Sequence, residues 1–201
     1  GEDFRLFQAV ETCSRFAIEL GINIPTGKDS LSMKQKYSNL EVKAPGTVVI
    51  SASAHCSDIK KVITPVVLSD GGDIYYIDFS NDKFYLGGSA FAQVLGYVGK
   101  KTPTIKNSEY FKTAFNVTQD LIKKGGISSG HDIGSGGLIT SLMELCFASK
   151  NIGLKIDISS FKSDSTCSIL FSEKIGILLQ SKNNLTEIYA KHAISCVKIG
   201  A

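Results

Sequence analysis

The chain has 201 residues, of which 43% are hydrophobic and 20% charged, and its formal net charge is only +3. Such a chain can bury a sizeable core within one or two domains. Its lysines form only short clusters without aromatic neighbours, which argues against nucleic-acid binding, and no apolar run approaches the roughly 20 residues of a membrane span. The five cysteines show no CxxC spacing, so we expect reduced thiols in a cytoplasmic protein rather than a zinc site or disulfides.

The first expected element is an amphipathic helix over residues 3–20, where apolar residues recur at spacings of three and four. The segment Pro25–Lys34 then combines a cation, a carboxylate and hydroxyl groups at the entrance to a strand. Such a set suits a phosphate-bearing or metal-bound ligand, and a solvated turn is an equally open interpretation. It is not a P-loop, because a carboxylate follows the lysine where a hydroxyl is needed. The candidate side chains are Lys28, Asp29, Ser30 and Ser32.

Residues 47–54 are rich in β-formers and largely apolar, which predicts a strand buried on both faces. A second strand is expected over 73–78, after a turn that contains Gly71 and Gly72. Gly87 and Gly88 then precede a short helical run and could bring backbone close to a ligand, although such a turn is often only a tight connection. Residues 108–124 have the pattern of another amphipathic helix.

A second candidate ligand segment covers Ser129–Gly137, which has four glycines in eight residues from Gly130 and leads directly into a helix. Its glycines would let a nucleotide phosphate lie against the main chain. Asp132 is close enough to the helix start to hold a divalent cation beside those phosphates, or it only caps the helix. We expect His131 to be packed or hydrogen-bonded rather than to bind metal.

The remaining chain alternates again. Strands are expected over 154–158, 175–180 and 195–199, with a helix over 183–192. Glu173 stands before the second of these strands, and the local sequence leaves open whether it is a surface carboxylate or a site residue. The order of elements predicts a layered mixed sheet covered by helices.

These motifs, in this order, resemble the phosphoribosylformylglycinamidine synthases, also called formylglycinamide ribonucleotide amidotransferases, in their large single-chain form. The resemblance covers nearly the whole chain. It is carried by Ile24–Lys34, Ala44–Ala52, Leu86–Gln93, His131–Leu138, Met143–Ala148 and Leu170–Glu173.

The resemblance implies an α+β fold and a piece of the second synthetase half of a longer enzyme. Residues 1–45 would be the C-terminal part of its barrel-forming N-terminal subdomain. Residues 46–201 would be the α/β/α C-terminal subdomain of the aminoimidazole-ribonucleotide synthetase superfamily. The partners would be the other synthetase half and a glutaminase domain that this chain lacks, so none of its cysteines would be the glutaminase nucleophile. The chain alone would be inactive, and exposed apolar surface would favour self-association.

The resemblance also implies the chemistry. ATP would activate the formamide oxygen of formylglycinamide ribonucleotide, and ammonia from glutamine would displace phosphate, with Mg²⁺ neutralising charge. The residues on the substrate side would be Lys28, Asp29, Ser30 and Ser32. Asp132 would bind Mg²⁺, and Gly134, Ser135 and Gly136 would contact bound ATP or ADP. Ile133, Gly134 and Ser135 replace an Arg, a Ser and an Asp of the family pattern, and the other Mg²⁺ ligands would lie upstream of residue 1.

Two alternatives are open on the sequence alone. The region could be a structural nucleotide-binding module without a catalytic role. It could also belong to a related kinase that acts on selenium or thiamine phosphates, although those relatives lack the Gly27–Lys34 string.

Overall fold

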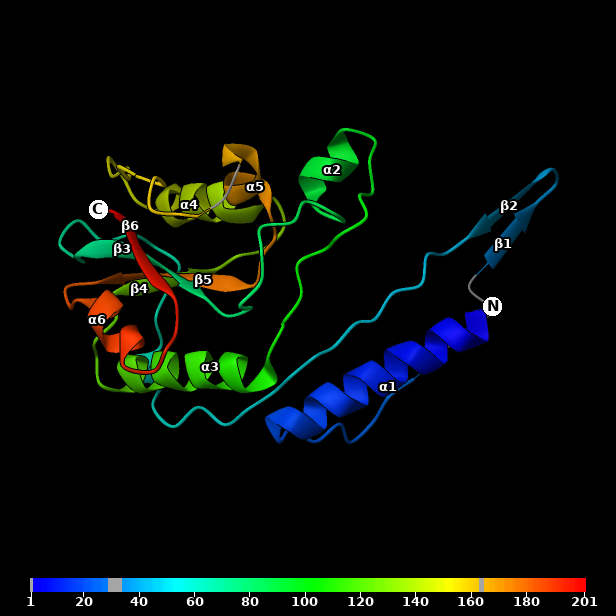
Figure 1. Ribbon diagram of the computed structural model, residues 1–201, viewed down its shortest axis with the longest axis horizontal. Coiled ribbons are helices and arrows are strands. Elements are labelled where there is room, and N and C mark those ends of the chain that lie inside the picture. The colour runs from blue at the N-terminus through cyan, green and yellow to red at the C-terminus, as the bar shows by residue number, and fades with distance from the viewer. Residues whose placement is uncertain (1, 29–33, 163–164) are drawn as a thin grey trace. The chain divides into compact units, whose positions relative to one another are not determined.

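The computed structural model describes residues 2–28, 34–162 and 165–201, which belong to two compact units (Figure 1). The N-terminal unit is Gly1–Ser57 and the C-terminal unit is Asp58–Ala201. The boundary predicted after residue 45 concerns the family's subdomains and not these compact units, so it stays a prediction. Within the described ranges no helix has the length and hydropathy that a membrane crossing requires.

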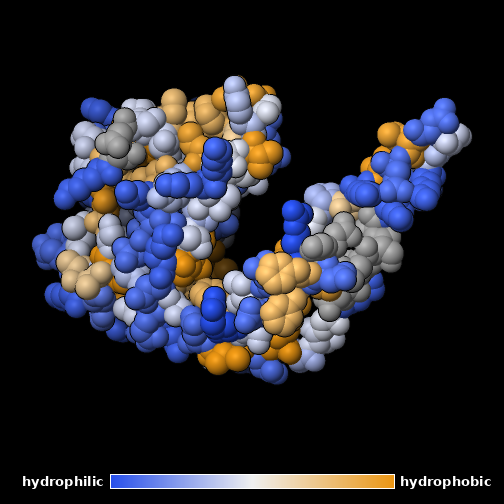
Figure 2. All heavy atoms as spheres, turned by 45° about the vertical axis from the view of Figure 1, so that its right-hand side comes forward, coloured by the Kyte–Doolittle hydropathy of each residue, from blue (hydrophilic) through white to orange (hydrophobic). Residues whose placement is uncertain are grey.

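The N-terminal unit consists of a long helix and a hairpin. Helix α1 (Glu2–Leu20) confirms the predicted amphipathic helix, and strands β1 (Lys34–Tyr37) and β2 (Leu40–Lys43) pair in antiparallel register. The apolar face of α1 is exposed, with Phe4 at 60% and Phe7 at 62%. Hydrophobic residues also lie at the surface of the hairpin (Figure 2). This exposed apolar surface is the basis for expecting self-association, which stays a prediction.

The strand predicted over residues 47–54 is not formed. These residues have no regular secondary structure, and Val49 and Ile50 are 83% and 68% exposed. A β-forming sequence becomes a strand only when a neighbouring strand supplies hydrogen bonds and side chains to pack against. The described residues of the N-terminal unit supply neither to this segment.

The C-terminal unit is built on an antiparallel sheet of four strands in the order β4-β5-β3-β6. Three were predicted, namely β3 (Asp73–Asp78), β5 (Gly176–Ser181) and β6 (Cys196–Gly200), whereas β4 (Ser129–Asp132) lies in the segment interpreted as a turn. The strand predicted over 154–158 forms only one bridge, Ile156 to Gly200, beside the end of β6. The sheet is therefore antiparallel in its described strands rather than mixed.

The helices of the C-terminal unit lie on both faces of the sheet (Figure 1). The prediction of helices over 108–124, after Gly137 and over 183–192 is confirmed, whereas α5 was not predicted. The described elements are the short 3₁₀ turn η1 (Ile59–Lys61), α2 (Ala90–Val94), α3 (Ser108–Lys123), α4 (Gly137–Phe147), α5 (Thr166–Phe171) and α6 (Leu185–Ala190).

The alternation of β3 explains the layering. Tyr75 and Ile77 point into a core with α3 and α6, while Ile74 and Tyr76 point into a second core with α4 and α5. Successive strand residues face opposite sides of a sheet, so a strand that is apolar at nearly every position must be covered on both. The expected α/β/α arrangement within an α+β fold is confirmed.

A buried ion pair fixes the segment that precedes β5. Lys174 Nζ lies 2.8 Å from Asp78 Oδ2, and both side chains are less than a tenth exposed. Asp78 Oδ1 also accepts hydrogen bonds from the amide and hydroxyl of Ser80, each at 2.8 Å. The ring of Phe84 lies beside the ammonium group, 4.5 Å from Nζ to the ring centroid. This pair ties the chain just after α5 to the end of β3.

The hydroxyl of Tyr76 lacks a hydrogen-bond partner among the described residues, although it is buried. Burial raises the pKa of this phenol well above its usual value. We therefore expect Tyr76→Phe to leave the free energy of unfolding unchanged or to raise it by about 1 kcal/mol, because it removes an unsatisfied polar group. Urea denaturation followed by circular dichroism measures the change.

Tyr189→Phe is the matched control. Tyr189 is equally buried, but its hydroxyl lies 2.6 Å from Thr118 Oγ1. Loss of the Tyr189 hydroxyl should lower the free energy of unfolding by about 1–2 kcal/mol. Equal destabilisation by both substitutions would show that the Tyr76 hydroxyl has a partner.

Candidate functional site

The second candidate ligand segment contains a glycine turn, which we define as Gly134–Gly137 and call the second glycine turn; it follows β4 and ends at the first residue of α4. The φ angles of Gly136 and Gly137 are 87° and 75°, values that residues with a Cβ rarely adopt. A Cβ on Gly137 would lie 2.7–2.8 Å from backbone atoms of residues 170–172. Glycine is thus required at Gly137 both by its backbone conformation and by the close approach of the C-terminal end of α5.

The turn leads into α4, whose N-cap residue, Gly136, has no side chain to cap the helix. The amide of Gly137 donates to the carbonyl of Gly134 at 3.1 Å, and Ser141 Oγ donates to the carbonyl of Asp132 at 3.0 Å. The start of a helix favours negative charge, and the amide of Gly136 already donates to a carboxylate oxygen of Glu173 at 3.0 Å. The proposed nucleotide contacts Gly134, Ser135 and Gly136 therefore form one continuous turn, with Ser135 on the surface.

Asp132 is at the end of β4, and its side chain is 85% exposed. The ring of His131 lies between two carboxylates, with Nδ1 3.6 Å from Asp132 Oδ1 and Nε2 3.3 Å from Glu144 Oε2. His131 Nδ1 is also 2.7 Å from the carbonyl oxygen of Asp132. Since a carbonyl only accepts, Nδ1 is the donor there, and His131 is hydrogen-bonded as expected.

The described residues do not gather a full set of metal ligands. Among residues 2–28, 34–162 and 165–201 no group of three or more His, Cys, Asp or Glu side chains could hold a metal ion. Asp132 nevertheless fits the way in which Mg²⁺ is usually held beside nucleotides, by one or two carboxylates together with phosphate oxygens. It is suited to a metal that arrives with its nucleotide.

The first glycine turn, which we define as Leu86–Ala90, leads into α2, whose first residue is Ala90. Ser89 caps that helix by accepting a hydrogen bond from the amide of Ala92 at 3.2 Å, and its hydroxyl donates to the carbonyl of Leu86 at 2.7 Å. Gly88 has a φ of 72°, and a Cβ on Gly87 would lie 2.3 Å from the carbonyl oxygen of Lys101. The turn is therefore also built on glycines that cannot be replaced without rearrangement.

Glu173, whose role the sequence left undecided, contacts both glycine turns. Its Oε1 accepts hydrogen bonds from the amide of Ala90 at 2.8 Å and from the amide of Gly136 at 3.0 Å. The preceding Ser172 donates its hydroxyl to the carbonyl of Tyr85 at 2.8 Å. Sequence reasoning missed this link. The sequence feature that could have indicated it is a serine and a glutamate directly after an apolar helical run.

The predicted residues of the first candidate segment are only partly described. Lys28 is exposed in the N-terminal unit, and Asp29, Ser30 and Ser32 lie outside the described residues. Their assignment to the substrate side stays a prediction. The second candidate segment is different, because the structure places Asp132 and the second glycine turn next to one another at the end of β4.

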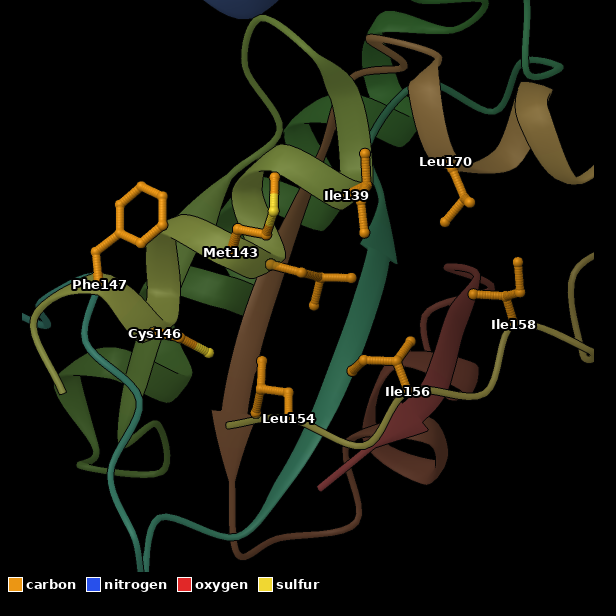
Figure 3. A pocket seen from close by; sticks show the side chains of 9 residues that line it. Ile139, Met143, Cys146, Phe147, Leu154, Ile156, Ile158 and Leu170 are labelled. Carbon is orange, nitrogen blue, oxygen red and sulfur yellow. The ribbon is translucent and has the colours of Figure 1, made fainter. Parts of the chain in front are cut away.

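A pocket of about 470 Å³ lies between α4 and residues 154–158 (Figure 3). Its walls carry apolar side chains and one thiol, and no charged group. Such a lining suits apolar contact rather than a phosphate or a cation. It is formed by Ile139, Leu142, Met143, Cys146, Phe147, Leu154, Ile156, Ile158 and Leu170.

The five cysteines are all free thiols. Cys196 is buried in the core between the sheet and α3, and burial raises the pKa of its thiol to about 12. A thiol that stays protonated at neutral pH is a poor nucleophile. Cys196 therefore packs as a small core side chain.

Two family models match the chain. The FGAR-AT PurM_N-like domain matches residues 1–55, and the C-terminal domain of AIR synthase related proteins matches residues 85–201. The chain is 41% identical, over 95% of its length, to a probable phosphoribosylformylglycinamidine synthase, chloroplastic/mitochondrial, of Arabidopsis thaliana. It is 38% and 35% identical, over its full length, to a probable phosphoribosylformylglycinamidine synthase of Caenorhabditis elegans and to the human phosphoribosylformylglycinamidine synthase. It spans only 14–16% of the length of these relatives.

Solved structures share the fold. Thermotoga maritima PurL complexed with FGAR matches 71% of this chain and 25% of that chain, with a TM-score of 0.56 and 17% identity. T. maritima PurL complexed with ATP matches 71% of this chain and 23% of that chain, with a TM-score of 0.53 and 14% identity. The resemblance drawn from the sequence motifs is confirmed. Because the C-terminal domain model covers more than half of its residues, the chain belongs to the family of AIR synthase related proteins.

Proposed function

We propose that this chain is part of an ATP-dependent amidotransferase of purine biosynthesis. The enzyme would convert formylglycinamide ribonucleotide, glutamine, ATP and water into formylglycinamidine ribonucleotide, glutamate, ADP and phosphate. The observation that carries the proposal is the identity of 35–41% with phosphoribosylformylglycinamidine synthases over nearly all of this chain. That range includes both candidate ligand segments. It favours the amidotransferase over a purely structural nucleotide-binding module.

The geometry supports a division of roles within that activity. The second glycine turn and the start of α4 would lie against the phosphates of ATP or ADP, since a helix start favours negative charge and Gly136 offers no side chain to cap it. Asp132 would hold Mg²⁺ against the same phosphates from the end of β4. Bound Mg²⁺ would supply charge neutralisation during phosphoryl transfer.

The segment around Lys28 would act on the other ligand. Lys28, Asp29, Ser30 and Ser32 would position formylglycinamide ribonucleotide, with the lysine offering a cation to its phosphate. The rest of the synthetase and a glutaminase domain would be partners in the longer protein. We place this activity in the cytoplasm, although the Arabidopsis relative is named chloroplastic/mitochondrial.

The role of Asp132 can be tested by nucleotide titration of the full-length enzyme. Asp132→Asn should weaken the binding of ADP in the presence of Mg²⁺ by about 10- to 100-fold, the range typical for the loss of groups that support a metal site. With EDTA in place of Mg²⁺, the variant and the wild type should bind ADP equally, because no metal then links the carboxylate to the phosphates. Isothermal titration calorimetry measures both affinities.

Asp70→Asn is a closely matched control. Asp70 is 84% exposed, and its carboxylate is paired with the exposed Lys182 at 3.3 Å. Its loss should leave the Kd for ADP unchanged. Equal affinities of the two variants for Mg²⁺ and ADP together would remove Asp132 from the site.

A further inference from the structure

The side chain of Glu173 joins the two glycine turns. We infer that Glu173 is a positioning residue that fastens the first and second glycine turns into one unit and thereby sets the affinity for a phosphate-bearing ligand. The second half of this inference rests on the proposed function. The first half concerns the ligand-free protein and is tested separately.

The hydrogen bonds of Glu173 explain why a carboxylate is needed. A single oxygen, Oε1, accepts from the amide that starts α2 and from an amide of the second glycine turn, at 2.8 and 3.0 Å. Hydrogen bonds to a carboxylate are shorter and stronger than those between neutral groups, and negative charge is favourable at a helix start. The two turns are therefore held by the same atom, although Ala90 and Gly136 are far apart in sequence.

The chain that carries Glu173 is itself fixed on both sides. The ring of Phe171 stacks on that of Phe91, with 4.5 Å between centroids, and Ser172 bonds to Tyr85 beside the first turn. The backbone of residues 170–172 touches Gly137 of the second turn. The next residue, Lys174, is anchored to the sheet through its buried pair with Asp78. Glu173 is thus held in place before any ligand arrives.

This arrangement makes the two turns mechanically dependent on one another. A ligand held at the second turn, beside the start of α4, needs Gly136 and Gly137 in their observed conformation. Glu173 supports that conformation through its hydrogen bond with Gly136. Glu173 is itself held by the amide at the start of α2 and by the stacking of Phe171 on Phe91. Groups that are already in position cost less to order when a ligand binds, so loss of the link should weaken binding.

The ligand-free test is hydrogen exchange measured by mass spectrometry on the full-length enzyme. In Glu173→Ala, amides in residues 86–95 and 134–140 should both exchange about tenfold faster, the factor expected for one lost charge-assisted hydrogen bond. Glu173→Gln keeps an acceptor oxygen and should restore most of the protection. Glu187→Ala is the control, because Glu187 accepts a hydrogen bond at the start of α6, on the opposite face of the sheet.

The affinity test uses ADP with Mg²⁺ as the probe. Glu173→Ala should weaken binding about tenfold, and Glu173→Gln should stay within about threefold of the wild type. Unchanged exchange in either turn, or unchanged affinity, would overturn the inference. Tighter binding by Glu173→Ala would also overturn it, since the carboxylate would then be a competitor of the phosphate. If the wild type itself binds no ADP, the proposed nucleotide role fails, and the exchange data alone decide whether Glu173 joins the turns.

Discussion

Lys174→Ala is expected to destabilise the C-terminal unit by about 3–5 kcal/mol, enough to lower its Tm by about 10 °C. The substitution leaves the carboxylate of Asp78 buried without its cation. A buried, unpaired charge is costly because neither water nor a counter-ion compensates it. The hydrogen bonds that Asp78 accepts from Ser80 remain and place the loss toward the lower end of that range.

The measurement is urea denaturation followed by far-ultraviolet circular dichroism. Lys182→Ala serves as the control, since its pair with Asp70 is exposed on both sides and should contribute less than about 1 kcal/mol. The double variant Asp78→Asn, Lys174→Met should be more stable than Lys174→Ala, because it leaves no unpaired charge in the interior. Equal stability of Lys174→Ala and Lys182→Ala would contradict the description of the pair as buried.

Gly137→Ala is expected to lower the free energy of unfolding by about 3 kcal/mol and to change the conformation of the second glycine turn. A left-handed conformation costs an alanine about 1–2 kcal/mol, and overpacking adds about 1–3 kcal/mol. Both penalties apply, because φ is 75° and the added Cβ would meet backbone atoms of Leu170, Phe171 and Ser172 at 2.7–2.8 Å. Backbone atoms cannot rotate away, so the chain that carries Glu173 would have to shift.

Gly134→Ala tests the same turn without those penalties. A Cβ at Gly134 has no described atom within 4 Å, and its φ is outside the left-handed region. This variant should have the stability of the wild type or exceed it by up to about 1 kcal/mol. Thermal unfolding measures the Tm of both variants. A Tm of Gly137→Ala equal to that of the wild type would show that Gly137 does not pack against the backbone of residues 170–172.

The elements best predicted from sequence are those whose pattern is local. The helices at 2–20 and 108–123 have periodic apolar positions, and β3 is bounded by a glycine turn, so their limits were predicted within a residue or two. β4 was missed because its pairing with β5 depends on residues about fifty positions away, and its sequence, Ser-Gly-His-Asp, has little β-propensity. The segment 47–54 shows the opposite case, a β-forming sequence without a described partner.

The candidate site was predictable to a similar extent. Glycines before a helix and a nearby aspartate are local signals, so the positions of Asp132 and the second glycine turn before a helix could be predicted, and their ligand roles stay predictions. The role of Glu173 could not be predicted, because its acceptor geometry joins amides 83 and 37 residues away along the chain. Only the packing of α5 between the two turns brings these groups together.

The most direct test of the central claim is the turnover of the full-length enzyme, measured as ATP- and glutamine-dependent formation of formylglycinamidine ribonucleotide. We predict that Lys28→Ala and Asp29→Ala each lower kcat/KM about a hundredfold, the size of effect typical for a lost charge-stabilising contact. Lys36→Ala, an exposed lysine of β1 paired with Glu41 at 3.6 Å, should have no effect. Unchanged turnover in both Lys28→Ala and Asp29→Ala would contradict the proposal that this segment faces the substrate.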